Sequence, residues 1–171
     1  MDSFRVYAVP LKSLRNGIHR FNWTLDSSFF EHFEASPIRK GVFKVSMELD
    51  KQDDLSSFQL NIEGSYKSVC DRCLANIEIP VNQQYQLYVK TSLEVVSDPS
   101  LICLSPGEVE LKMAGIFYDY ICLSLPITQT INCGQMESPP CDKDILSRIQ
   151  SADDFQSEET VWDALKKLKE N

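Results

Sequence analysis

Three stretches of the sequence alternate apolar and polar residues with a period of two, and this alternation constrains the fold more than any other feature. The stretches run from Val42 to Leu49, from Phe58 to Tyr66 and from Ile77 to Val89. Because successive side chains of a β-strand point to opposite faces, each stretch places its apolar side chains on one face. The pattern predicts an antiparallel sheet with one face in the core and the other in water.

Further elements are predicted on either side of these strands. Alternation over His19–Leu25 predicts another strand, and helical spacing over Glu110–Leu123 predicts a helix. A short helix is expected to begin near Ser28, which has the spacing of a capping box with Glu31, and Asp142 can cap another. Since strands come first and helices later, we predict an α+β fold. The sequence leaves open whether the sheet closes like a barrel.

The length and the charge pattern predict the domain organisation. A chain of 171 residues suits one domain with a short appendage, and we expect a single α+β domain over residues 1–150. Residues 151–159 carry four acidic residues and no basic one, which indicates a solvated linker. Residues 160–171 then read as a C-terminal amphipathic helix.

The charge is unevenly distributed along the chain. The formal net charge is -8, yet residues 1–40 carry a net charge of +2. Nucleic-acid binders usually show a basic surface because phosphate contacts dominate their affinity. Any RNA contact is therefore expected at this first segment, where the candidate contact residues are Lys12, Arg15, His19 and Arg20, and otherwise the acidic body is expected to meet a basic protein. In the alternative, the neighbouring Phe21 and Trp23 face the core, and the basic residues are ordinary surface charges.

Hydropathy and cysteine usage indicate the compartment. No apolar run approaches the roughly 20 residues of a membrane-spanning helix, and the first residues lack the apolar stretch of a signal peptide. We therefore expect a cytoplasmic protein with no membrane partner. Six cysteines are many for a compartment where disulfides rarely persist, so some are expected to be buried thiols and some to bind metal.

Four of the cysteines form a candidate metal site. Cys70 and Cys73 make a C-x2-C pair, and Cys133 and Cys141 stand seven residues apart in a loop. A structural zinc ion takes four such ligands, and C-x2-C is a common half-site. A redox pair would instead need a helix directly after Cys73, where the sequence shows strand-like alternation and Pro80. Four reduced thiols without metal are the third interpretation.

No other set of residues points to catalysis. The sequence lacks a P-loop, a glycine-rich dinucleotide turn, a nucleophile elbow and an HExxH motif. Its carboxylates are scattered over the polar faces of the predicted strands and helices. We therefore expect a protein that is not an enzyme and has no small-molecule substrate.

With these motifs in view, the chain resembles the YceD family, in the form found in Bacteroidetes. The matching segments are NGIHRFNWTLDSSFFEHFE at 16–34, CDRCLANIEIPV at 70–81, the stretch 104–126, CDKDIL at 141–146 and WDALKKLKE at 162–170. Cys70, Cys73 and Cys141 match the family pattern. Related sequences carry a histidine in the stretch 127–132, which has none here, and Cys133 takes over its position as the fourth ligand.

The resemblance implies a function in ribosome assembly. The family is similar to proteins that support accumulation of large-subunit ribosomal RNA, and no enzymatic activity comes with it. The partners that it implies are a precursor of the large ribosomal subunit, ribosomal RNA or a basic ribosomal protein. A thiol-based redox or metal-sensing protein and a generic protein-interaction module are the alternatives.

Overall fold

The computed structural model describes residues 4–92, 98, 100–133 and 136–153, and the chain divides into two compact units. We call Met1–Ser68 with Glu78–Ile127 the sheet unit, and Val69–Ile77 with Thr128–Asn171 the cysteine unit. The tip of one hairpin thus belongs to the same unit as the chain after Ile127. A single domain over residues 1–150 stays a prediction.

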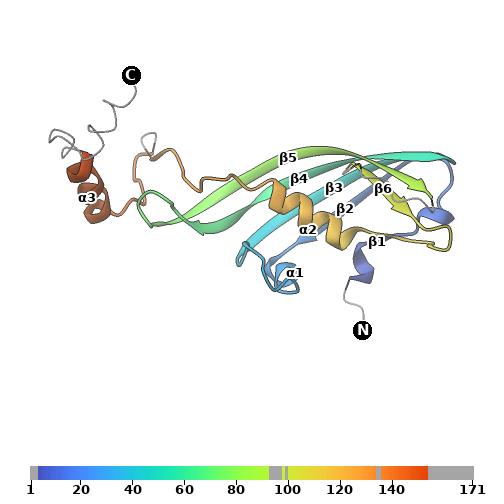
Figure 1. Cartoon of the computed structure of the whole chain (residues 1–171), viewed down its shortest axis with the longest axis horizontal. Coiled ribbons are helices and arrows are strands. Elements are labelled where there is room, and N and C mark those ends of the chain that lie inside the picture. The colour runs from blue at the N-terminus through green and yellow to red at the C-terminus, as the bar shows by residue number, and fades with distance from the viewer. Residues whose placement is uncertain (1–3, 93–97, 99, 134–135, 154–171) are drawn as a thin grey trace, which may run out of the picture. The chain divides into compact units, whose positions relative to one another are not determined.

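A five-stranded sheet dominates the fold and confirms the α+β class (Figure 1). Its order is β2 (Gly17–Leu25), β3 (Gly41–Lys51), β4 (Leu55–Val69), β5 (Asn76–Thr91) and β6 (Leu101–Leu104). β2 and β4 both pair antiparallel with β3, whereas β6 pairs parallel with β5, so the sheet is mixed at one edge. The sheet is open, because β2 and β6 stand at its two edges. Two short segments form a separate antiparallel pair, β1 (Ala8–Val9) with β7 (Leu111–Lys112).

Short helices complete the fold. Within the described residues these are two 3-10 turns, η1 (Arg5–Tyr7) and η2 (Leu11–Ser13), and three α-helices, α1 (Ser27–Phe30), α2 (Met113–Leu123) and α3 (Lys143–Asp153). The predicted capping box of α1 is wrong, because Asp26 precedes the helix and accepts a hydrogen bond from the Ser28 amide at 3.0 Å. Glu31 lies at the other end of this single turn.

The predicted C-terminal segments are only partly described. Asp142 caps α3 as expected, since its Oδ1 accepts from the amide of Asp144 at 3.0 Å. α3 runs on to Asp153, into the segment predicted as a linker. The remainder of that segment and the predicted helix over 160–171 lie outside the described residues.

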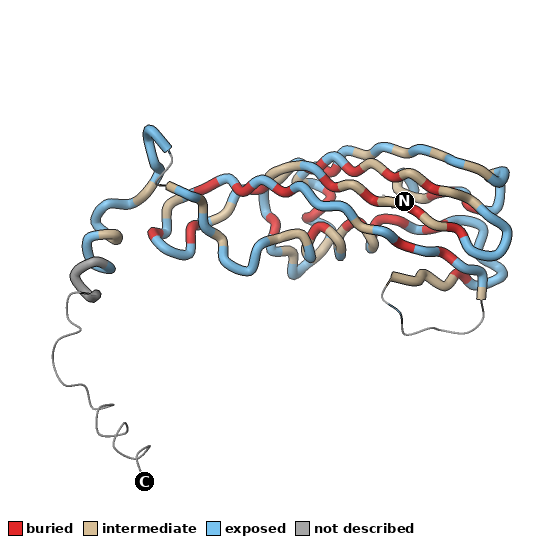
Figure 2. Tube along the Cα trace, turned by 90° about the horizontal axis from the view of Figure 1, so that it is seen from above, coloured by how far each residue is buried: buried red, intermediate tan, exposed pale blue. Residues whose placement is uncertain are grey.

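The core confirms the predicted alternation. Figure 2 shows buried and exposed residues alternating along the strands of the sheet. Nearly all the apolar side chains of the three long strands that were expected inside are buried, among them Phe43, Val45, Met47, Leu49, Phe58, Leu60, Ile62, Tyr66, Leu87 and Val89. Tyr85 is half-buried. α1 and α2 lie along one side of the sheet (Figure 1), and Phe117 of α2 packs against Trp23 with ring centroids 4.8 Å apart. Trp23 thus faces the core.

One glycine is required by the packing of β3 against β4. Gly64 pairs with Phe43, and a Cβ atom at Gly64 would lie 2.2 Å from the carbonyl oxygen of Val42. No side chain fits at that distance, so the close approach of the two strands depends on glycine here.

Candidate metal centre

The first pair of cysteines lies in a tight backbone knuckle between β4 and β5. The Leu74 amide donates to the Cys70 carbonyl at 2.9 Å, and the Cys70 amide donates to the Ala75 carbonyl at 2.8 Å. Leu74 has a φ of 57° and is the only non-glycine residue with positive φ in the described part of the chain. This left-handed residue reverses the chain, and the amide of Ala75 then donates a hydrogen bond to the sulfur of Cys73.

A pair of hydrogen bonds connects the knuckle to the loop that carries the second pair of cysteines. The Asp71 amide donates to the Gln129 carbonyl at 3.0 Å, and the Gln129 amide donates to Asp71 Oδ2 at 2.6 Å. The two residues are 58 positions apart in the sequence. This role of Asp71 could not be predicted from the sequence, in which its position between the two knuckle cysteines is the only sign of it.

The structure brings the four predicted cysteines together within the cysteine unit. The Cys73 side chain is hydrogen-bonded to those of Cys70 and Cys141, and the Cys141 side chain is also hydrogen-bonded to that of Cys133. Cys70 and Cys73 are buried, at 2% and 1% exposure, while the other two are half-buried. All four are free thiols in the structure, so no disulfide accounts for their proximity.

The contacts among these thiols shift their pKa values in opposite directions. The amides of Ala75 and Asp142 donate to Cys73 and hold its pKa below the usual value for a thiol. The hydrogen bond with Cys133, reinforced by burial and by Cys73, raises the pKa of Cys141 to about 12. The cluster therefore favours one thiolate and opposes further ionisation, since adjacent negative charges repel each other.

The donor set fits zinc in its chemistry. Thiolates are preferred zinc ligands, and backbone amides that donate to a ligand sulfur orient it and stabilise its charge. Zinc binding would require the four thiols to lose their protons. The arrangement itself is not a ready cage, because no group of three or more His, Cys, Asp or Glu among the described residues is placed to hold an ion. Zinc at Cys70, Cys73, Cys133 and Cys141 therefore stays a prediction.

The two remaining cysteines stand apart from this cluster. Cys103 lies in β6 and Cys122 in α2, and both are half-buried free thiols. Burial raises the pKa of Cys122, as expected for an unreactive thiol in apolar surroundings.

The basic residues predicted to contact RNA lie in the sheet unit, and most of them already have partners. Arg20 forms an ion pair with Glu48 at 2.7 Å, and Lys12 Nζ donates to the carbonyl of Pro106. His19 Nε2 lies 2.8 Å from the carbonyl oxygen of Arg15, within hydrogen-bond distance. The nearby Phe21 ring is stacked on Trp23, whose indole donates to the carbonyl of Val6 at 3.1 Å.

Comparisons with known proteins leave the family unassigned. The chain matched no protein-family model, no curated protein and no solved structure. The resemblance to the YceD family accordingly rests on the sequence motifs alone.

No helix within the described residues is both long enough and apolar enough to cross a membrane.

Proposed function

We propose that the protein is a non-enzymatic factor that supports accumulation of large-subunit ribosomal RNA and assembly of the large ribosomal subunit, and that a structural zinc ion holds its cysteine unit together. The observation that carries the zinc proposal is the linked set of contacts among four thiols from two segments. Fifty-nine residues separate Cys73 from Cys133, and nothing but tertiary structure unites them.

A structural role suits the surroundings of these thiols better than a redox role. A catalytic C-x-x-C thiol is activated at the N-terminus of a helix. After Cys73 the chain makes the left-handed turn at Leu74 and enters β5 at Asn76, so the activating helix is missing from this position. Amides that donate to a sulfur also stabilise a metal-bound thiolate, and the amides of Ala75 and Asp142 could have this role at Cys73.

The ribosomal part of the proposal is supported by the sequence motifs and by the charge distribution. The resemblance to the YceD family covers nearly the whole chain. The body of the protein is acidic, with a net charge of -5 over residues 41–109, which would attract a basic ribosomal protein. The proposed partner is a precursor of the large subunit, in which RNA and basic proteins are both present.

Depletion of the protein tests the ribosomal proposal. We expect the level of 23S ribosomal RNA and the 50S peak of a sucrose gradient to fall, and to recover when the wild-type chain is supplied. A variant with Cys70→Ser and Cys73→Ser should restore neither, whereas Cys103→Ser, a free cysteine outside the cluster, should restore both. Unchanged 23S and 50S levels would overturn the proposal. Affinity capture that recovers partners but no ribosomal component would favour a generic interaction module.

A further inference from the structure

A cluster of basic side chains lies where β3 begins and β4 nears its end. Arg39 and Lys40 directly precede β3, and Lys67 lies in β4. The Lys67 amide donates to the Lys40 carbonyl at 2.8 Å, so these two lysines are cross-strand neighbours. All three side chains are exposed, and none forms an ion pair with another described residue. They differ in this respect from Arg20, which is neutralised by Glu48.

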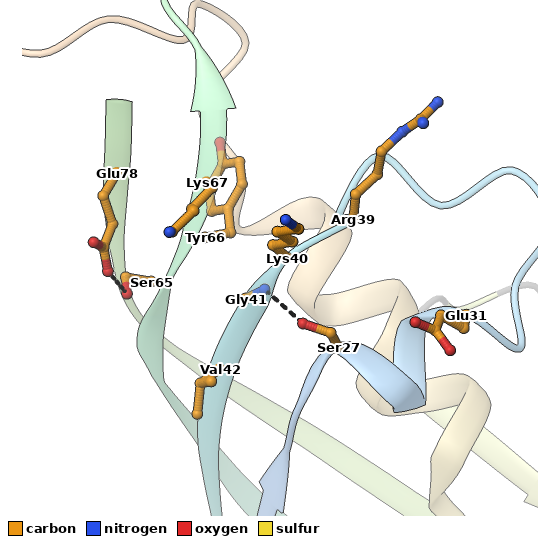
Figure 3. A pocket seen from close by; sticks show the side chains of 10 residues that line it. All are labelled: Ser27, Glu31, Arg39, Lys40, Gly41, Val42, Ser65, Tyr66, Lys67 and Glu78. Atoms are coloured by element: carbon orange, nitrogen blue, oxygen red, sulfur yellow. Dashed lines mark hydrogen bonds between the residues drawn. The ribbon is translucent and has the colours of Figure 1, made fainter. Parts of the chain in front are cut away.

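These three cations line a cavity of about 380 Å³ in the sheet unit. Figure 3 shows Lys40 and Lys67 at its upper end, above Val42, and the Arg39 guanidinium pointing away from the other labelled side chains. Of the two carboxylates in the lining, Glu78 is hydrogen-bonded to the Ser65 hydroxyl.

The cavity continues along one face of the sheet. Because side chains alternate along a strand, every second residue of β3 and its partner on β4 share the exposed face. We call the resulting cross-strand pairs the β3–β4 strip: Lys40 with Lys67, Val42 with Ser65, Lys44 with Glu63, and Ser46 with Asn61. A second cavity of about 310 Å³ lies farther along this strip, and Asn22 of β2 joins Lys44, Ser46 and Asn61 in its lining.

The order of these groups along the strip indicates a ligand. Phosphates bind to exposed lysine and arginine, and side-chain amides and hydroxyls hydrogen-bond base edges and the 2′-hydroxyl of RNA. An acidic peptide could also pair its carboxylates with these cations, and the proposed function in ribosome assembly favours RNA over it. A basic protein would be repelled by Lys40 and Lys67. Base edges are accessible in single strands, so single-stranded RNA fits best.

We propose that the β3–β4 strip binds single-stranded RNA, with backbone phosphates at Arg39, Lys40 and Lys67 and with bases or riboses at Asn22, Ser46 and Asn61. This inference rests on the proposed function, because it names the part of the molecule that touches ribosomal RNA. It also places the contact away from Lys12 and Arg20, whose charged groups are bound within the protein. Asn61 Nδ2 donates to Ser46 Oγ at 3.5 Å, and its second N–H and its carbonyl oxygen would serve the RNA.

Binding of a labelled RNA at several salt concentrations tests the proposal. The full-length protein is titrated into a fluorescein-labelled single-stranded RNA of about 12 nucleotides, and anisotropy is read from about 50 to 200 mM salt. Three phosphate contacts predict a slope of log K against log salt of roughly -2. The double variant Lys40→Gln, Lys67→Gln should reduce the slope to about -0.7 and weaken binding about 25-fold at 0.1 M salt.

Two further variants separate the strip from general charge. Lys12→Gln with Arg15→Gln removes the same number of charges from the other basic segment and should leave affinity and slope close to wild type. Asn61→Ala should weaken binding without changing the slope, because an amide contact releases no counterion. Competition with inorganic phosphate and with an oligoglutamate peptide distinguishes a site for RNA from sites for free phosphate or acidic protein.

The outcomes are distinct. RNA binding that depends on Lys40 and Lys67 and resists both competitors supports the proposal. Equal loss in the Lys12, Arg15 variant, displacement by millimolar phosphate, preference for the peptide, or no RNA binding at about 50 mM salt would each overturn it. If depletion lowers 23S ribosomal RNA while the purified protein binds no RNA, this inference fails and the proposed function stands.

Discussion

Leu74 provides a sharp test of the knuckle geometry, because its backbone conformation is unfavourable for leucine. At a φ of 57°, a residue with a Cβ atom costs about 1–2 kcal/mol relative to the ordinary helical region. Glycine avoids this cost but loses about 0.5–1 kcal/mol more conformational free energy on folding than alanine. The Leu74 side chain is 63% exposed, so its removal sacrifices little packing. We therefore expect Leu74→Gly to be more stable than Leu74→Ala by about 0.5–1 kcal/mol.

Arg72 is the matched control, since it is exposed, lies in the same knuckle and does not have positive φ. Arg72→Gly should be less stable than Arg72→Ala by about 0.5–1 kcal/mol. The stability difference between the glycine and alanine variants therefore has opposite signs at positions 72 and 74. Native-state hydrogen exchange at the amides of Cys70 and Leu74 measures both differences, because these amides are bonded within the knuckle. Equal destabilisation by glycine at positions 72 and 74 would refute the left-handed turn.

Three further predictions concern the sheet unit. Gly64→Ala should lower its free energy of unfolding by about 3 kcal/mol in urea, because the new Cβ meets the Val42 carbonyl. Phe117→Ala should cost about 3–5 kcal/mol in the same assay, since this ring is fully buried. The Ser28 hydroxyl and amide donate to Asp26 and hold the pKa of its carboxyl below 3.8, so NMR titration should give a midpoint below that value. The ionised carboxylate stabilises the fold above pH 3.8, and this stabilisation is lost as the pH falls through the folded-state pKa. An Asp26 midpoint at or above 3.8, or unchanged stability in either substituted variant, would contradict the corresponding contact.

The sequence predicts the sheet well because its signal is local. Alternation from Phe43 to Leu49 depends only on which face of the strand is buried, and the structure buries that face. Caps are predicted less reliably, since several nearby residues compete: Asp142 was identified, but Asp26 rather than Ser28 caps α1. The parallel pairing of β6 with β5 has no local signal, because β6 is only four residues long and its own residues do not specify the partner strand or its direction.

The candidate sites also combine features with a local sequence signal and contacts that have none. Cysteine is a preferred metal ligand, so the four thiols could be named as a candidate site from the residue type and the C-x2-C spacing. The link between Asp71 and Gln129 could not, because aspartate is common in turns and its partner is 58 residues away. The neighbourhood of Lys40 and Lys67 likewise depends on the register of β3 against β4, which the alternation of each strand leaves unspecified.

The metal content of the purified protein tests the central claim most directly. Elemental analysis should find about one zinc per chain, and X-ray absorption should place four sulfurs about 2.3 Å from it. Cys141→Ser should lower the zinc content, and Cys103→Ser, which changes a thiol outside the cluster, should leave it unchanged. Protein that contains no zinc, or zinc that is retained equally by both variants, would contradict a metal centre at Cys70, Cys73, Cys133 and Cys141.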